Sequence, residues 1–176
     1  MALIWVLRHA KAVAHNKDDH GRALTGRGRR QCAEVGKWLR SGDCPEPLPG
    51  LVWSSSAIRA RETAALALAD VLGSSPGVAG HVEVEQWLYQ AHPDNVVDRL
   101  RLLGAEVASV MVVGHNPTMA ELAMGLLGPA DPVGRAIMEQ GMATGAVAVV
   151  EVTPGPWSGL SMGEGTLRAL HVPTAR

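Results

Sequence analysis

The 176-residue sequence lacks phenylalanine and contains a single tyrosine, so aliphatic side chains and five tryptophans must fill its hydrophobic interior. It has two cysteines, Cys32 and Cys44, which form neither a metal-binding spacing nor a framework of several disulfides. We therefore expect a reduced, cytoplasmic protein. A chain of this length can bury roughly 70% of the surface that it exposes when unfolded. We expect residues 1–176 to form one domain that folds without disulfides or metal ions.

The sequence also lacks a large net charge and a long apolar run. Its formal net charge of −1 argues against general binding to nucleic acids or to membrane surfaces. The apolar run at the N-terminus, MALIWVL, stops at Arg8. It is too short for the apolar region of a signal peptide and far too short to span a membrane. We expect neither a nucleic acid nor a membrane as partner, and a monomer or weak dimer.

Apolar strand-like runs and amphipathic helical runs alternate along the chain. The strand-like runs lie at 2–7, 51–54, 81–85, 108–115, 144–153 and 166–172. The helical runs, in which apolar residues recur every three or four positions, lie at 25–40, 55–73, 93–103 and 116–128. Strands that alternate with helices of this length predict an α/β fold. We expect a three-layer α/β/α domain with a mostly parallel central sheet and an antiparallel C-terminal strand.

Polar residues follow three of the expected strands. Arg8 and His9 follow the first strand, Arg59 lies shortly after the second, and His115 ends the run at 108–115. Taken singly, each of these residues also fits a structural or solvent-exposed role. In open α/β sheets, however, ligands bind outside the carboxyl ends of the strands, so these four side chains should meet at one edge. Two guanidinium groups beside a helix N-terminus suit a phosphate group.

Three motifs carry a resemblance to a known family. LRHAKA at 7–12, SSSAIRARETA at 54–64 and VVGHNP at 112–117 resemble, in order and spacing, the motifs of the histidine phosphatase superfamily, which includes the phosphoglycerate mutases. The resemblance covers nearly the whole chain. The short length and three further segments (LTGRGRRQ, LYQAHPD and TGAVAVVEV) are more similar to the small SixA-type phosphohistidine phosphatases. The resemblance implies a phosphoglycerate mutase-like fold.

The resemblance also implies a catalytic role for each of the four residues. His9 would be the nucleophile and would form a covalent phosphohistidine intermediate, which water then hydrolyses. Arg8 and Arg59 would bind the phosphoryl oxygens, and His115 would donate a hydrogen bond to the phosphoryl group in transfer. The family mechanism requires no metal ion and no cofactor. Phosphoglycerate mutase activity is not expected, because the chain lacks the length for the segments that retain the intermediate during transfer.

The first motif departs from the pattern of many relatives, which read Arg-His-Gly followed by a hydroxyl residue and then asparagine. The corresponding positions here are Ala10, Ala12 and His15, and an asparagine, Asn16, follows one place late. Asn16 is therefore a candidate substrate-binding residue on which the sequence leaves the decision open.

The proton donor is a second departure. Members of the family that act on sugar phosphates use a carboxylic acid to protonate an alkoxide leaving group. Glu85 lies in the corresponding part of the chain and is a possible donor, although its surroundings, VEVEQWLYQ, do not match that motif. Asp18 and Asp19 are alternatives on a loop that could reach the site. Each of these three carboxylates also fits a solvated position on the surface.

Three functions follow as hypotheses. The first is a phosphatase that removes phosphate from phosphohistidine in a protein partner. The second is a phosphomonoesterase with a carboxylate donor that acts on a small phosphate ester, and the third is a phosphate-binding module without catalysis. The weak match for a proton donor favours the first, because a leaving imidazole needs far less acid assistance than an alkoxide.

A cluster of arginines follows the first motif. Arg22, Arg27, Arg29 and Arg30 lie within nine residues of one another. They form either a solvated helix start or a basic rim that attracts an acidic phosphoprotein. Aromatic residues do not alternate with these arginines, so the segment does not resemble a nucleic-acid-binding patch.

Overall fold

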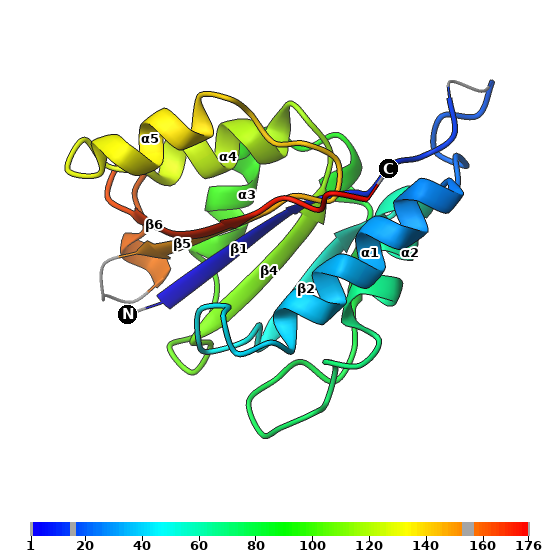
Figure 1. Cartoon of the computed structure of the whole chain (residues 1–176). Coiled ribbons are helices and arrows are strands. Elements are labelled where there is room, and N and C mark those ends of the chain that lie inside the picture. The colour runs from blue at the N-terminus through cyan, green and yellow to red at the C-terminus, as the bar shows by residue number, and fades with distance from the viewer. Residues whose placement is uncertain (1, 15–16, 153–156, 176) are drawn as a thin grey trace.

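A six-stranded sheet forms the centre of the computed structural model, which describes residues 2–14, 17–152 and 157–175 (Figure 1). The strands are β1 (Ala2–Arg8), β2 (Leu51–Ser55), β3 (Glu83–Glu85), β4 (Ser109–Gly114), β5 (Val147–Val152) and β6 (Thr166–His171). Their order in the sheet is β3-β2-β4-β1-β5-β6. The first four in this order run parallel, whereas β5 pairs antiparallel with both β1 and β6. The expected mostly parallel sheet with an antiparallel C-terminal pairing is confirmed.

Helices cover both faces of the sheet. The helices are α1 (Gly26–Leu39), α2 (Ile58–Leu68), α3 (Pro93–Leu100), α4 (Thr118–Leu126) and α5 (Pro132–Met138), with short 3-10 turns η1 (Trp87–Tyr89) and η2 (Trp157–Gly159). Figure 1 shows α1 and α2 on one side of the sheet and α3, α4 and α5 on the other, which confirms the three-layer architecture. In the described residues, no helix is both long enough and apolar enough to cross a membrane.

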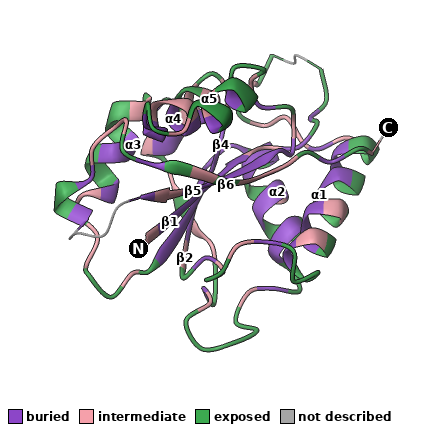
Figure 2. Cartoon of the chain, turned by 60° about the vertical axis from the view of Figure 1, so that its left-hand side comes forward, coloured by how far each residue is buried: buried purple, intermediate pink, exposed green. Residues whose placement is uncertain are grey.

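The continuous apolar run of β1 is explained by its burial on both faces. Ile4 and Val6 pack into the core beneath α3 and α4, whereas the alternate residue Trp5 packs into the core beneath α1 and α2. All three side chains are fully buried. Figure 2 shows this buried band passing through the middle of the molecule. A strand with two buried faces cannot show the polar alternation of a half-exposed strand, because successive side chains point to opposite faces.

The parallel pairing places the ends of β1, β2 and β4 at one edge. Arg8 at the end of β1 is in register with Gly114 at the end of β4. The next residue, His9, donates its backbone N–H to the Gly114 carbonyl at 2.9 Å. Ser54 of β2 is in register with Val113, one residue before the end of β4. The residues that follow the three strands therefore emerge side by side.

Candidate active site

His9 is held in one tautomer by its neighbour. Its Nδ1 lies 2.8 Å from the Ala10 carbonyl oxygen. Because a carbonyl oxygen can only accept, Nδ1 carries the proton and donates it, which leaves the lone pair on Nε2. An imidazole in this form can attack an electrophile through Nε2.

The charge state of His9 follows from its surroundings. Burial lowers the pKa of His9 to about 4, and the positive charges of Arg59 and Arg8 act in the same direction. The hydrogen bond to the Ala10 carbonyl opposes this shift only in part. The ring is therefore neutral at pH 7, as a nucleophilic imidazole must be.

His115 lies against His9 at the end of β4. The two ring centroids are 5.1 Å apart. Nε2 of His115 shares a 2.7 Å hydrogen bond with the Ser55 hydroxyl at the end of β2. Burial lowers the pKa of His115 to about 3, with a further contribution from His9. Its Nδ1 is buried and has no hydrogen-bond partner among the described residues. The site therefore contains two neutral imidazoles in contact.

The side chain of Arg8 is oriented by a residue that is distant in the sequence. Its Nη1 donates a 2.6 Å hydrogen bond to the Met142 carbonyl, in the segment that leads into β5. The same carbonyl accepts from Nδ2 of Asn116, next to His115, at 3.1 Å. Nε of Arg8 is buried and has no partner within the described part of the chain. One backbone carbonyl thus orients side chains from both motifs.

Arg59 lies in the first turn of α2, and its side chain is only 5% exposed. It donates one hydrogen bond to the Asp19 backbone carbonyl at 2.6 Å and a second to the Asp19 carboxylate at 3.0 Å. Its own carbonyl accepts from the Thr63 hydroxyl at 2.6 Å, and that hydroxyl accepts from the Ala10 N–H at 3.0 Å. The first turn of α2 is therefore tied to the segment that follows His9.

Asp19 is the anion beside Arg59. Its carboxylate pairs with Arg22 at 2.8 Å and accepts a 2.8 Å hydrogen bond from the Tyr89 hydroxyl. The hydrogen bond from Tyr89, together with Arg22 and Arg59, holds the pKa of Asp19 well below its usual range. The carboxylate is therefore ionised. It offsets the unfavourable interaction of a cation with the N-terminus of α2.

This pairing corrects two expectations for the loop. Asp19 is not a free surface carboxylate: its side chain is partly exposed, but four hydrogen bonds from the side chains of Arg22, Arg59 and Tyr89 bind its carboxylate and carbonyl within the site. An ionised carboxylate also has no proton to donate, so Asp19 does not fit the role of general acid. Asp18, in contrast, is exposed and accepts a hydrogen bond from the Gly21 N–H at 3.0 Å. It stabilises a turn and does not contact the arginines of the site.

The remaining two candidates lie apart from this cluster. Glu85 is the last residue of β3, in register with Ser55, so its backbone reaches the same edge of the sheet. Its side chain is half-buried, and within the described residues no hydrogen bond or ion pair joins it to His9, Arg8 or Arg59. Asn16 lies outside the described residues.

Three residues of the site were not found from the sequence, namely Ser55, Tyr89 and Met142, and Arg22 was named there only as part of the arginine cluster. The Tyr89 ring packs edge-on against His115, with centroids 5.6 Å apart, and its hydroxyl reaches Asp19. The LYQAHPD segment, which contains Tyr89, was identified in the sequence only for its similarity to SixA-type phosphatases. The Met142 contribution is a backbone carbonyl, which leaves no signal in the sequence.

The site is suited to an anion. Two guanidinium groups, two neutral imidazoles and the first turn of α2 surround one edge of the sheet. Planar guanidinium groups match the oxygens of a phosphate group. In the part of the chain that the structure describes, no group of three or more histidine, cysteine or acidic side chains is placed to hold a metal ion.

Comparison with known proteins agrees with this geometry. The sequence model of the histidine phosphatase superfamily (branch 1) matches residues 4–76. A Mycobacterium tuberculosis protein of unassigned function is 33% identical over 171 residues, which cover 95% of this chain and 99% of that protein. A Mycobacterium leprae protein, also of unassigned function, is 31% identical over 175 residues, which cover 95% of this chain and 99% of that protein. The chain belongs to the histidine phosphatase superfamily.

Solved structures place this histidine phosphatase close to the SixA group. A Nakamurella multipartitia protein assigned as a phosphohistidine phosphatase SixA matches with a TM-score of 0.80 and 27% identity, over 99% of this chain and 97% of that chain. The protein histidine phosphatase SixA in complex with tungstate matches with a TM-score of 0.73 and 25% identity, over 97% of each chain. An Escherichia coli protein assigned as an α-ribazole-5'-P phosphatase shares the fold, with a TM-score of 0.68 and 17% identity over the full length of both chains. The chain is a SixA-like phosphatase enzyme with a phosphoglycerate mutase-like fold.

Proposed function

We propose that this histidine phosphatase removes the phosphoryl group from phosphohistidine carried by a protein partner. The observation that carries the proposal is the pairing of the Asp19 carboxylate with Arg59, Arg22 and the Tyr89 hydroxyl, which lowers the pKa of Asp19 and favours its ionised form. A phosphatase for alkyl esters needs a protonated acid next to the leaving group. The carboxylate beside Arg59 lacks that proton. The site therefore suits a leaving group that does not need protonation by an acid of the enzyme.

The leaving group decides how much acid assistance the reaction needs. An imidazole that has taken a proton from solvent on its second nitrogen leaves as a neutral molecule, and the unperturbed pKa of histidine is about 6.5. An alkoxide is a base comparable to hydroxide, whose conjugate acid, water, has a pKa of about 15.7. Phosphohistidine is therefore the better substrate for a site in which the carboxylate paired with Arg59 is ionised.

The proposed reaction has two steps. In the first, Nε2 of His9 attacks phosphorus, and the new P–N bond forms as the P–N bond to the leaving imidazole breaks. Nδ1–H of His9 keeps its hydrogen bond to the Ala10 carbonyl, which stabilises the positive charge on the phosphorylated ring. In the second, water attacks phosphorus, the bond to Nε2 breaks, and phosphate leaves with one proton released to solvent. Arg8, Arg59 and His115 stabilise the phosphoryl oxygens in both steps.

The similarity to SixA proteins supports the substrate class. Both SixA structures are named for phosphohistidine or protein histidine phosphatase activity, and each aligns with almost the whole of this chain. Among the described residues, no subdomain is inserted between the three motifs, which is consistent with a phosphoryl group on another protein as substrate.

The test compares phosphate release from a histidine-phosphorylated phosphotransfer domain with release from a panel of alkyl phosphates, in the presence of a chelator. His9→Ala serves as the blank, and His81→Ala, at an exposed histidine two residues before β3, serves as the matched control. Faster release from the phosphorylated domain, lost in His9→Ala and kept in His81→Ala, supports the proposal. Release from neither substrate above the His9→Ala blank contradicts it.

A second candidate function rests on Glu85. Because Glu85 is in register with Ser55 at the same edge of the sheet, its carboxyl group could serve a small phosphate ester. This function predicts preference for alkyl phosphates and a large loss of that activity in Glu85→Gln. Glu83→Gln, two residues earlier in β3, is the matched control.

A further inference from the structure

The basic residues of the chain are distributed unevenly. Residues 11–30 contain six basic and two acidic side chains, a net charge of +4. The rest of the chain contains ten basic and fifteen acidic side chains, a net charge of −5. A segment of twenty residues is thus strongly positive in a protein whose total charge is −1.

This positive segment borders the candidate active site. It begins two residues after His9 and continues into the first turn of α1. The Lys11 carbonyl accepts hydrogen bonds from the Thr25 N–H at 2.9 Å and the Thr25 hydroxyl at 3.0 Å. A Cβ at Gly28 would lie only 2.2 Å from the Lys11 carbonyl oxygen, so this close packing requires glycine. Lys11 is therefore fixed beside the start of α1, where Arg27 lies.

Some of the positive charges in the segment are neutralised within the protein. Arg22 pairs with Asp19, and Arg29 pairs with Glu62 at 3.0 Å. Lys11 and Arg27 are exposed, and neither forms an ion pair with a described residue. Within the part of the chain that the structure describes, Arg27 donates to the neutral carbonyl of Ala175, at 3.0 Å.

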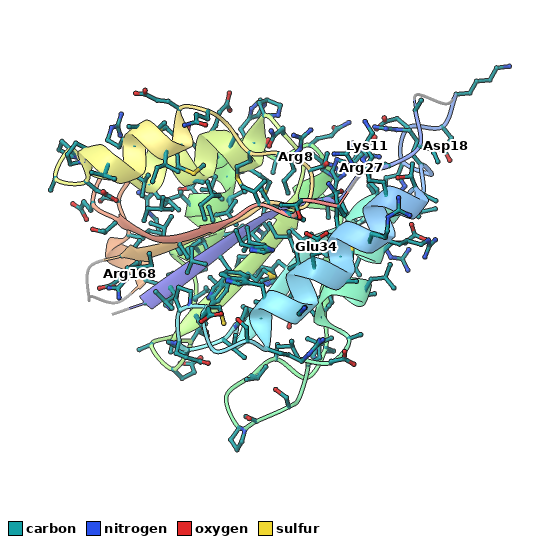
Figure 3. The ribbon with its side chains drawn as sticks, viewed as in Figure 1. Arg8, Lys11, Asp18, Arg27, Glu34 and Arg168 are labelled. Carbon is teal, nitrogen blue, oxygen red and sulfur yellow. The ribbon has the colours of Figure 1, made fainter. Side chains whose placement is uncertain are left out.

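The structure places these two charges on the side of the molecule that carries the site. Figure 3 shows Lys11 and Arg27 next to each other near Arg8, whereas Arg168 lies at the far end, where it pairs with Glu151. The first turn of α1 contains no acidic residue that would balance them. The positive end of the helix dipole adds to the same field.

We propose that Lys11 and Arg27 form a docking surface, the basic rim, for an acidic face of the protein that carries the phosphohistidine. The proposal rests on the proposed function and adds the charge of the partner. Complementary charge around a site accelerates encounter and orients the partner, and the effect weakens as salt screens it. The basic rim lies outside the phosphoryl site, so it acts on partner choice and not on the chemistry.

An acidic protein fits the basic rim better than a nucleic acid does. The large hydrophobic side chains that are exposed among the described residues are all aliphatic, so no aromatic platform is available for stacking of bases. One of them, Val13, is 39% exposed and lies two residues from Lys11, where it offers an apolar contact to a protein surface.

Two synthetic peptides of equal length test the basic rim. Each carries one histidine phosphorylated with phosphoramidate, flanked by glutamates in one peptide and by lysines in the other. The readout is the ratio of kcat/KM for the acidic peptide to kcat/KM for the basic peptide. We expect a ratio of about 10 at low salt that approaches one at high salt, where charges are screened beyond about 3 Å at 1 M.

Charge-reversal variants locate the effect. Lys11→Glu and Arg27→Glu should each lower the ratio at least about threefold. Lys37→Glu introduces the same charge change in the last turn of α1 and should leave the ratio as in the wild type. A wild-type ratio near one, or a ratio that neither rim variant lowers, overturns the basic rim.

A binding measurement separates failure of the basic rim from failure of the proposed function. If neither phosphopeptide is hydrolysed, the proposed function is wrong, and fluorescence anisotropy of the labelled, unphosphorylated acidic peptide decides on the rim. Binding that weakens in Lys11→Glu and Arg27→Glu but not in Lys37→Glu supports it, and unchanged binding overturns it. Tighter binding of a DNA duplex than of the acidic peptide would overturn the assignment to a protein partner.

Discussion

The parallel strands β1, β2 and β4 begin at one edge of the sheet, the amino edge, and end at the other, the carboxyl edge. Buried polar groups at these two edges differ in whether they have hydrogen-bond partners. At the amino edge, the buried Ser109 hydroxyl donates to the Leu48 carbonyl at 2.6 Å and accepts from the Gly50 N–H at 2.9 Å. At the carboxyl edge, Nε of Arg8, Nε of Arg59 and Nδ1 of His115 are buried without a partner among the described residues. Buried donors are normally satisfied, so groups left open mark the edge that is built for a ligand.

The side chains at the two edges differ in charge as well. A surface hollow at the amino edge is lined by Glu46, Glu106 and Ser109 among others, and contains no basic side chain. The carboxyl edge carries Arg8 and Arg59. The amino edge would repel a phosphate group, whereas the carboxyl edge attracts one. The polar groups at the amino edge therefore stabilise the fold, whereas those at the carboxyl edge are available to bind a substrate.

The largest effect is expected at Arg59. Arg59→Lys keeps a positive charge but loses the planar fork that binds the Asp19 carbonyl and carboxylate and that would bind the phosphoryl group in the proposed reaction. We expect a loss of about 10²- to 10³-fold in kcat/KM, by comparison with the removal of one transition-state donor in other enzymes. Steady-state kinetics with a phosphohistidine substrate measure it. Arg61→Lys, an exposed arginine in the same helix, should leave kcat/KM within twofold of the wild type, and an equal loss there would refute the assignment.

The next largest effect concerns the amino edge and falls on stability alone. Ser109→Ala removes the hydroxyl that donates to the partly buried Leu48 carbonyl and accepts from the Gly50 N–H. The free energy of unfolding should fall by about 1 kcal/mol, the usual net contribution of a hydrogen bond. Denaturant titration measures it. The rate of phosphate release by the folded variant should equal that of the wild type; a slower rate would mean that the amino edge contributes to the site.

A smaller effect is expected at Asp19. Asp19→Asn keeps the shape of the side chain but removes its charge, so Arg59 and Tyr89 are held less firmly. We expect kcat/KM to fall a few-fold, because the carboxylate is partly exposed and solvent screens its ion pairs. An increase in kcat/KM would show that the carboxylate competes with the substrate for the arginines.

The same variant tests the pH dependence of stability. The pKa of Asp19 is lowered in the folded state, so its carboxylate stabilises the fold above the unfolded value of 3.8. This contribution is lost as the pH falls below 3.8 toward the folded pKa. The difference in unfolding free energy between wild type and Asp19→Asn should therefore be constant above about pH 5 and should shrink below pH 4. A difference that persists unchanged at pH 3 would contradict the ionised pairing.

The smallest perturbation is a pH titration of the wild-type protein. Nuclear magnetic resonance titration of the histidine side chains should show His9 protonating at about pH 4 and His115 at about pH 3, well below the ordinary value of 6.5. His9→Ala and His115→Ala assign the two signals. A midpoint near 6.5 for His9 would mean that the ring is solvated and that the carboxyl edge is not the low-dielectric site described above.

Most of the fold could be predicted from the sequence, because hydrophobic periodicity carries it. The run of β1, buried on both faces, and the helical spacing of α1 and α4 predicted the layers. Helix α5 was missed because its seven residues are too few to show periodicity. Its signal was local: Asp131 caps the helix by accepting from the Gly134 N–H at 2.8 Å, and Pro132 follows the cap.

The site was predictable where it depends on strand ends and not where it depends on loops. Arg8, His9 and His115 are brought together by the register of β1 with β4, which follows from the α/β pattern. The contact of Asp19 with Tyr89 joins residues seventy positions apart through an irregular loop and a 3-10 turn. Neither segment has a periodicity that would indicate its path, so the sequence alone left Asp19 among the surface carboxylates.

The attachment of His9 to the sheet has a consequence for the timing of the reaction. Its backbone N–H is bonded to Gly114, so His9 extends the ladder between β1 and β4, the two central strands. Central ladders open only when a large part of a protein unfolds, and their amides exchange with solvent correspondingly slowly. The candidate nucleophile is therefore anchored to the most persistent part of the molecule. In the proposed reaction, we expect the lifetime of a phosphoryl group on His9 to depend on the access of water and not on motion of the backbone that bears it.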